Sequence, residues 1–249
     1  MSLLKVEGLS RQFGSLVAVN GVSMDVEAGQ LRAVIGPNGA GKTTLFNQIS
    51  GFFPPTAGRL VFDGNDITRL PPHRRVAMGI ARTFQITEIF PELTVHENLT
   101  IAVEVAAGFR LRPWLSRLAK RRVQERVDEL LELAGLSATA DRVANELPHG
   151  DQRATEISMS LALRPRLLLL DEPTAGMGDQ ETYDVTRLIQ KLRQQRDLAI
   201  VLIEHDMRVI FHLADRILVL GEGEVLAEGT PAEIAADERV QTAYLGKAA

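Results

Sequence analysis

One stretch of eight residues limits the possible fold more than any other feature of the sequence. Residues 36–43 read G-P-N-G-A-G-K-T, and three glycines allow the backbone to wrap with its N–H groups pointing inward. A short β-prone run, Leu31–Ile35, comes before this stretch, and a helix-compatible run, Lys42–Ser50, follows it. A strand, a glycine-rich loop and a helix in this order predict a loop that binds phosphate at the positive end of the helix.

The chemistry expected of this loop is nucleotide binding. Lys42 would reach the β- and γ-phosphates of ATP, and the Thr43 hydroxyl would be a ligand of Mg²⁺. The residues predicted to bind the nucleotide are Gly36, Pro37, Asn38, Gly39, Ala40, Gly41, Lys42, Thr43 and Thr44.

A second signal is an apolar strand that ends in two carboxylates. Residues 167–170 are four leucines, and Asp171 and Glu172 follow them directly. The carboxyl ends of parallel strands line the ligand crevice of a sheet, so we expect both acids to lie near the phosphates. We expect Asp171 to be a ligand of Mg²⁺ and Glu172 to polarise the attacking water.

The order of elements predicts the fold. After the first strand, loop and helix, β-prone runs at 167–170, 198–203 and 217–220 alternate with helical segments, which favours a parallel sheet covered on both faces. Residues 116–134 have apolar positions at helical spacing and are followed by Gly135, a helix stop. The first 30 residues hold short alternating segments, 3–6 and 22–26 among them, punctuated by glycines at 14, 21 and 29.

We therefore expect an α/β protein with three parts. They are a phosphate-loop, RecA-like parallel-sheet core, an N-terminal antiparallel β subdomain and an inserted α-helical subdomain. The expected boundaries place residues 1–86 and 165–249 in the β subdomain and core, and residues 87–164 in the helical subdomain.

Composition and charge exclude several classes of protein. The net charge of −4 gives no overall basic field for nucleic acid, and the absence of cysteine removes disulfides, thiolate zinc sites and cysteine nucleophiles. The first residues lack the basic and apolar regions of a signal peptide, and no apolar run approaches the roughly 20 residues that span a bilayer. We expect a cytoplasmic protein whose membrane role, if any, depends on another chain.

Several further stretches resemble one family throughout the chain. They are R-T-F-Q at 82–85, L-P-H-G-D-Q-R at 147–153, D-E-P-T-A-G-M at 171–177, I-E-H-D at 203–206 and A-Y-L-G at 243–246. In their order and spacing they resemble the ATP-hydrolysing subunits of ABC transporters, and most of all the ATPase subunit of branched-chain amino acid importers.

The resemblance assigns further roles. Phe13 falls where the family stacks an aromatic ring on adenine, and Gln85 where a glutamine ligates Mg²⁺ or the attacking water. His205 corresponds to the histidine that contacts the γ-phosphate and positions the base. The expected catalytic residues are thus Lys42, Gln85, Glu172 and His205, and the expected metal ligands are Thr43, Gln85 and Asp171.

The signature loop departs from the widespread form of the family, L-S-G-G-Q. Pro148 replaces the serine, His149 the first glycine and Asp151 the glutamine, while Gly150 persists. In the family this loop closes over ATP bound to the opposite subunit, so Pro148, His149 and Gly150 join the expected nucleotide contacts. Proline has neither hydroxyl nor N–H, which removes one charge-assisted hydrogen bond of about 1.5 to 3 kcal/mol. Gly178 also stands where the family often has aspartate. We expect a heterodimer with a second ATPase subunit.

The resemblance also implies partners and a place in the cell. Two transmembrane permease subunits and, indirectly, a solute-binding protein would work with this chain at the inner face of the cell membrane. Residues 86–93 would help to form the groove for a permease helix, with Ile89 and Phe90 as its apolar floor, although local core packing explains these residues equally well.

Other functions stay open at this point. One is a soluble ABC ATPase that acts on nucleic acid or ribosomes, although the chain has one cassette and no cysteine zinc module. A small-molecule kinase would share the phosphate loop but leave the signature region and His205 unexplained. Within transport, the cargo could also be urea, short amides or lipopolysaccharide.

Overall fold

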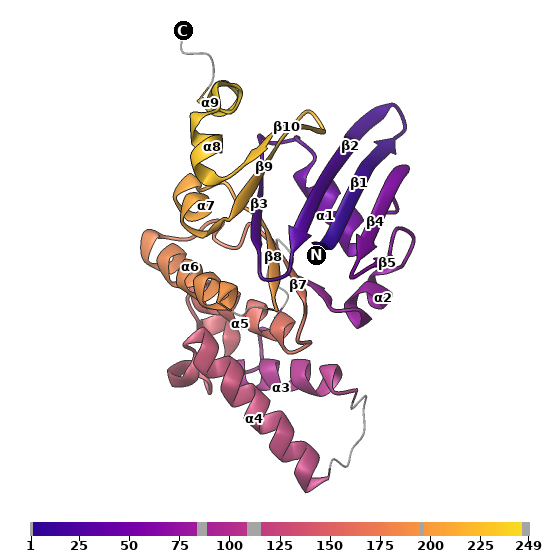
Figure 1. Cartoon of the computed structure of the whole chain (residues 1–249). Coiled ribbons are helices and arrows are strands. Elements are labelled where there is room, and N and C mark those ends of the chain that lie inside the picture. The colour runs from indigo at the N-terminus through magenta and orange to yellow at the C-terminus, as the bar shows by residue number, and fades with distance from the viewer. Residues whose placement is uncertain (1, 84–88, 109–115, 195–196, 246–249) are drawn as a thin grey trace.

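The computed structural model describes residues 2–83, 89–108, 116–194 and 197–245 of the 249-residue chain. Its centre is a six-stranded sheet in the order β10-β9-β3-β8-β7-β6, in which every pair is parallel except β9 with β10 (Figure 1). The strands are β3 (Leu31–Ile35), β6 (Ile80–Arg82), β7 (Leu167–Asp171), β8 (Ala199–Ile203), β9 (Arg216–Gly221) and β10 (Glu224–Gly229). This sheet confirms the predicted parallel core.

A second sheet is antiparallel, as predicted for the N-terminal residues. Its order is β2-β1-β4-β5, and its strands are β1 (Ser2–Phe13), β2 (Leu16–Glu27), β4 (Ala57–Phe62) and β5 (Asn65–Asp66). The first two strands are longer than the predicted segments. Of the three glycines in this region, only Gly14 separates the two strands of the hairpin. Gly14, at φ +59°, forms the turn, whereas Gly21 lies inside β2 where the register shifts, as at a β-bulge.

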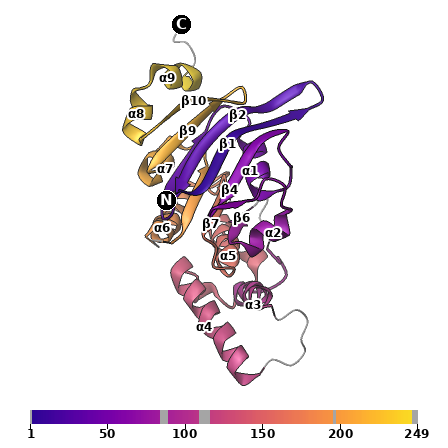
Figure 2. The same ribbon diagram turned by 45° about the vertical axis from the view of Figure 1, so that its right-hand side comes forward.

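Nine α-helices surround and extend the sheets in the described part of the chain. They are α1 (Lys42–Ser50), α2 (Pro72–Ala77), α3 (Val95–Ala106), α4 (Arg117–Ala134), α5 (His149–Leu161), α6 (Asp179–Arg193), α7 (Met207–Leu213), α8 (Pro231–Ala236) and α9 (Glu238–Leu245). Short 3₁₀ turns lie at Ser137–Thr139 and Ala144–Glu146. Helices α3 and α4 occupy the end of the molecule away from α8 and α9 (Figures 1 and 2).

The predicted helix at 116–134 shows why the sequence folds this way locally. The Ser116 hydroxyl accepts a hydrogen bond from the Ala119 N–H and caps α4, and Gly135 ends the helix in the left-handed region at φ +76°. Val123 and Val127 lie on the buried face of α4 with Leu130, as their spacing predicted.

Two apolar clusters meet at the six-stranded sheet. Leu167 and Leu169 of β7 face a core shared with α1 and the antiparallel sheet, whereas Leu168 and Leu170 face the core that contains α3 to α6. Burial on both faces explains why this strand reads as a continuous run of leucines. The carboxyl ends of β3, β7 and β8 are therefore fixed by packing on both sides.

No helix in the described ranges is long and apolar enough to cross a bilayer. The longest, α4, has 18 residues, and its exposed face is rich in charged side chains.

Candidate functional site

The loop between β3 and α1 depends on its glycines for steric reasons. Gly41 begins α1 at φ +98°, and a Cβ at this position would lie 2.4 Å from the carbonyl oxygen of Ala18 in β2. A Cβ on Gly36 would lie 2.3 Å from the carbonyl oxygen of Leu220 in β9. The loop is thus pressed between the antiparallel sheet and the end of the parallel sheet, and a side chain at either glycine would collide with backbone.

Lys42 lies inside this loop. Its ammonium is buried and donates hydrogen bonds to the carbonyl oxygens of Gly36, at 2.6 Å, and Pro37, at 3.1 Å. Burial lowers the pKa of Lys42, and the negative charges of Glu172 and Asp171 oppose that shift. The cation of the loop and the two carboxylates at the end of β7 therefore lie within electrostatic reach of each other.

Asp171 is held by an ion pair at the end of β7. Its carboxylate is buried, and its Oδ2 lies 2.9 Å from Nη2 of Arg82, the last residue of β6. Nη1 of Arg82 donates to Asn47 Oδ1 at 2.7 Å and to Ser50 Oγ at 3.0 Å, both on α1. Arg82 thereby joins β6, the helix of the phosphate loop and the carboxylate predicted to serve Mg²⁺.

Glu172 and His205 face each other across the ends of two adjacent strands. Glu172 Oε1 lies 2.8 Å from His205 Nε2, and the Glu172 N–H donates to the Ile203 carbonyl at 2.9 Å. Glu172 has φ +47°, an uncommon backbone conformation for a residue other than glycine. Strain of this kind concentrates at functional sites, and here it follows the two carboxylates predicted from sequence.

A buried carboxylate next to His205 fixes this segment. Glu204 is 3% exposed and accepts hydrogen bonds from the N–H and the hydroxyl of Thr174, which lies two residues beyond Glu172. It also accepts a bond from the His205 N–H at 2.7 Å. Because one carboxylate binds both segments, the position of the histidine relative to Glu172 is set by a buried charged hydrogen-bond network.

The signature segment, residues 147–153, forms the start of α5. Pro148 is the N-cap residue, and both it and His149 are exposed. Gly150 is buried, and its N–H donates to Glu181 Oε1 of α6 at 3.2 Å. One turn later, Nη2 of Arg153 donates to the Asp171 carbonyl oxygen at 2.6 Å. The signature helix therefore contacts the end of β7 directly.

Phe13 lies at the end of the β1–β2 hairpin and is 38% exposed. The Arg11 guanidinium lies 4.5 Å from the centroid of its ring, and Phe53 meets the ring edge to face at 5.6 Å. The same hairpin carries Ala18, whose carbonyl touches Gly41, so Phe13 belongs to the sheet end that borders the phosphate loop.

The structure thus brings together Lys42, Asp171, Glu172 and His205, whereas the signature residues form a separate group joined to them through Arg153. Gln85 lies outside the described residues, and so do residues 86–88 of the expected permease groove. Thr43 is exposed at the first turn of α1, and Thr44 is half-buried. Four residues that hold the site were not predicted from the sequence: Arg82, Arg153, Glu181 and Glu204. The first two and Glu204 lie inside the recognised stretches, and Glu181 lies four residues after one of them.

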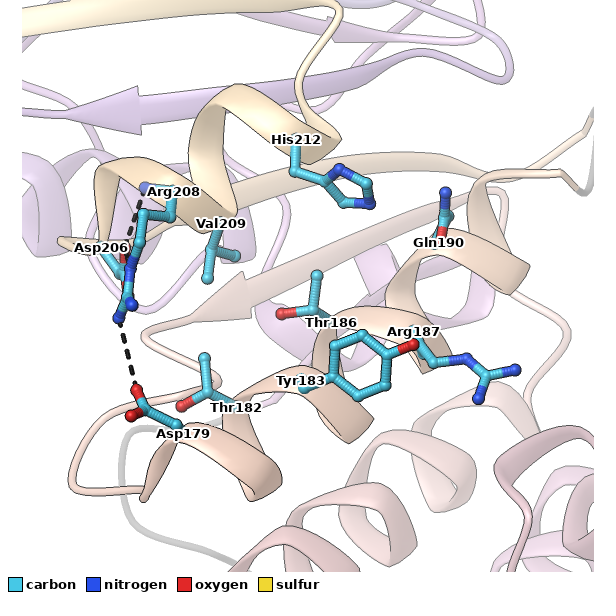
Figure 3. A pocket seen from close by; sticks show the side chains of 10 residues that line it. All are labelled: Asp179, Thr182, Tyr183, Thr186, Arg187, Gln190, Asp206, Arg208, Val209 and His212. Atoms are coloured by element: carbon cyan, nitrogen blue, oxygen red, sulfur yellow. Dashed lines mark hydrogen bonds and ion pairs between the residues drawn. The ribbon is translucent and has the colours of Figure 1, made fainter.

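A hollow lies beside the site. A cavity of about 490 Å³ between α6 and α7 is lined by Tyr183 and His212 among others (Figure 3). Arg208 spans one end of it, 2.8 Å from Asp206 and 3.7 Å from Asp179. This exposed ion pair joins the starts of the two helices that follow β7 and β8.

Comparisons with known proteins show the family of the chain. The ABC transporter family matches residues 19–175, and a branched-chain amino acid ATP-binding cassette transporter family matches residues 224–249. The chain is 43% identical to the high-affinity branched-chain amino acid transport ATP-binding protein BraF of Pseudomonas aeruginosa, over 99% of this chain and 98% of that one. It is 33% identical to the lipopolysaccharide export ATP-binding protein LptB of Escherichia coli K12, with the same coverage.

Solved structures agree as well. The ADP conformation of MJ1267, an ATP-binding cassette of an ABC transporter, superposes with a TM-score of 0.87 at 31% identity, over 99% of this chain and all of that one. A dimeric, post-hydrolysis ATP-binding cassette, MJ0796, bound to ADP and phosphate gives 0.75 at 26% identity, over 92% of this chain and 98% of that one. The chain therefore belongs to the ATP-binding subunits of ABC transporters, which are ATPases.

Proposed function

We propose that this chain hydrolyses Mg-ATP to energise an importer of branched-chain or related amino acids. The observation that carries the catalytic part is the pair of Glu172 and His205, 2.8 Å apart beside the carboxylate of Asp171 and the buried cation of Lys42. In this role Glu172 polarises the attacking water, His205 orients Glu172 and contacts the γ-phosphate, and Lys42 binds the phosphates.

The residues present fit Mg²⁺. Thr43 and Asp171 supply the oxygen ligands that this ion prefers, and Gln85 would add an amide oxygen. Oδ2 of the Asp171 carboxylate contacts Arg82. When bound, the ion neutralises charge on the phosphates. The Lys42 ammonium has three N–H donors, and its bonds to the Gly36 and Pro37 carbonyls use two of them.

We propose further that two ATPase subunits close on each other, with each nucleotide between one phosphate loop and the partner's signature segment. The dimeric structural relative supports pairing. Pro148 removes both a hydroxyl and an N–H from this chain's signature segment, which favours a heterodimer with a second ATPase subunit. Residues 87–164 would move as the helical subdomain, and the bond from Arg153 to the Asp171 carbonyl would carry that movement to the phosphate site.

The membrane side of the proposal rests on the relatives. BraF is named for high-affinity branched-chain amino acid transport, and the C-terminal family match carries the same substrate. Two permease subunits, with a solute-binding protein acting through them, would place this chain on the inner face of the cell membrane. We propose that a permease helix docks at Phe90, which is 47% exposed, and at the half-buried Ile89. Co-purification of a branched-chain solute-binding protein and its permeases supports this cargo, and lipopolysaccharide export partners contradict it.

The catalytic assignment is tested by Glu172→Gln. The variant should keep ATP binding and lose about 10² to 10⁴ in hydrolysis rate, because the general base is gone. Glu129→Gln, which alters a carboxylate on the exposed face of α4, is the matched control and should hydrolyse ATP at the wild-type rate. Normal turnover by Glu172→Gln contradicts the assignment.

The pairing is tested in the same background. Light scattering of Glu172→Gln with ATP should show little self-association, and a stable pair should form only with the second ATPase subunit. A stable homodimer with both sites filled contradicts the heterodimer.

A further inference from the structure

One carboxylate connects the two loops that would face a partner subunit. Glu181 Oε1 accepts a hydrogen bond from the Gly150 N–H of the signature segment, and Oε2 accepts one from the Gly178 N–H at the start of α6, both at 3.2 Å. Glu181 is the third residue of α6, so its bond to Gly178 is an ordinary helix-capping contact. The bond to Gly150 is different, because it crosses to another helix.

The start of α5 carries one acidic residue of its own in the first turn, Asp151, and Glu181 adds a second from α6. Pro148, the N-cap, makes no side-chain hydrogen bond to the helix. An α-helix concentrates partial positive charge and free N–H groups at this end, which is why such ends bind phosphate. The Gly150 and Gly178 N–H groups hold the pKa of Glu181 below its usual value, so the side chain that occupies this end is ionised at neutral pH.

Helix α6 packs so closely on Gly150 that little space is left for a phosphate to pass Glu181. A Cβ on Gly150 would lie 3.2 Å from Glu181 Cβ and 3.5 Å from its Cα, so α6 packs directly on the signature glycine. Other acids lie close by: burial and the charge of Asp184 raise the pKa of Asp151, in the first turn of α5. A phosphate that approaches the signature segment would therefore meet the negative charge of these acids as well as the N–H groups of the loop.

We propose that Glu181 is an internal anion that occupies the signature segment's phosphate position and must withdraw before a partner's nucleotide can bind there. The proposal rests on the proposed pairing of two ATPase subunits and adds a specific residue to it. It makes the site completed by this chain's signature segment weak for two reasons: Pro148 lacks donors, and Glu181 uses the Gly150 donor.

The test compares Glu172→Gln with Glu172→Gln/Glu181→Gln in ATP-driven pairing. This chain is mixed with the ATPase subunit that co-purifies with it, or is used alone if the protein is a homodimer. Light scattering then measures the association of subunits as a function of ATP concentration. Neutralising Glu181 should strengthen ATP-driven pairing roughly tenfold, because repulsion between carboxylate and phosphate is removed. Pairing with ADP should not change, because ADP lacks the γ-phosphate.

A matched control has the same chemistry at another helix. Glu233, the third residue of α8, caps Thr230 as Glu181 caps Gly178, but it contacts no part of α5 among the contacts of the described residues. Glu233→Gln should leave pairing unchanged.

The outcomes separate the two proposals. Equal or weaker pairing after Glu181→Gln contradicts the internal anion; weaker pairing would show that Glu181 only positions the signature segment. Absence of ATP-driven pairing in every variant contradicts the proposed function itself, and the inference falls with it.

Discussion

The two halves of a nucleotide site that this chain would contribute are held in different ways. The phosphate-loop half comprises residues 36–44 with Asp171, Glu172 and His205, and it is built at the carboxyl ends of strands buried on both faces. The signature half comprises residues 147–153 and 175–181 at the starts of two helices, where residues 148–149, 175–176 and 178–180 are exposed. The first half is anchored in the buried sheet, whereas the second half depends on contacts between the starts of α5 and α6.

This difference has a physical reason. A site that positions phosphates and an attacking water gains from rigid elements, since misplacement by about 1 Å costs roughly 10² in rate. A surface that must meet another subunit and part from it again has to tolerate adjustment, and helix ends with exposed loops adjust at low cost. Arg153 joins the halves, because it lies on α5 and donates to the Asp171 carbonyl.

The largest expected effect comes from a methyl group placed in the phosphate-loop half. Gly41→Ala combines φ +98° with a Cβ 2.4 Å from the Ala18 carbonyl oxygen, so we expect a loss of about 3 kcal/mol in unfolding free energy. That corresponds to a fall in Tm of roughly 6 to 12 °C, measured by calorimetry. Gly39→Ala is the control, because Gly39 has φ +82° but no atom within 4 Å of its added Cβ, and it should lose less than half as much. Equal losses would show that backbone strain and not the collision matters.

A smaller effect should follow from the buried network behind His205. Thr174→Val keeps the shape of the side chain but removes the hydroxyl that donates to the buried Glu204 carboxylate. A hydrogen bond to a charged group contributes about 1.5 to 3 kcal/mol, so we expect a loss of about 2 kcal/mol in denaturant unfolding and a reduced ATPase rate. Thr242→Val, on the exposed face of α9, should change neither quantity. Full stability with a lowered rate would assign Glu204 to positioning alone.

Much of the fold follows from the sequence because it depends on local patterns. The leucines of β7, the glycine-rich loop and the serine and glycine that begin and end α4 each determine their element within a few residues. The carboxylates at the end of β7 also pointed to the site, because strand ends meet at one edge of a parallel sheet.

The supporting contacts did not follow, because they join distant residues. Arg82 and Asp171 are 89 positions apart, and Thr174 and Glu204 are 30 apart. Each of these pairs forms only once two strands lie side by side, and no local spacing encodes it. Gly21 misled the strand prediction for a related reason: a glycine inside a bulge looks in sequence like a glycine at a turn.

A third prediction concerns charge in the phosphate-loop half. Burial lowers the pKa of Lys42, so holding this lysine protonated destabilises the ATP-free fold. That cost is present below the folded-state pKa and disappears as the pH rises toward 10.5. Lys42→Met should therefore unfold at a temperature no lower than wild type at pH 7, and its advantage should shrink at higher pH. ATP should no longer raise its Tm.

The exposed Lys120→Met on α4 is the control and should change neither Tm nor its response to ATP. A Tm for Lys42→Met well below wild type at pH 7 would mean that the bonds to the Gly36 and Pro37 carbonyls outweigh the cost of burial.

The smallest effect on stability should come from the counterpart of Gly41→Ala in the signature half. Gly150 lies in the first turn of α5 without a left-handed φ, and an added Cβ would lie 3.2 Å from Glu181 Cβ, so we expect the start of α6 to yield by a few tenths of an ångström. Alanine also favours the helix over glycine by up to about 1 kcal/mol, so Gly150→Ala should stay within about 0.5 kcal/mol of wild type by calorimetry. A loss as large as that of Gly41→Ala would show that both halves are equally rigid. The signature half would then have to move as one body with α6. Rotation of the Glu181 side chain alone would no longer be sufficient to release it.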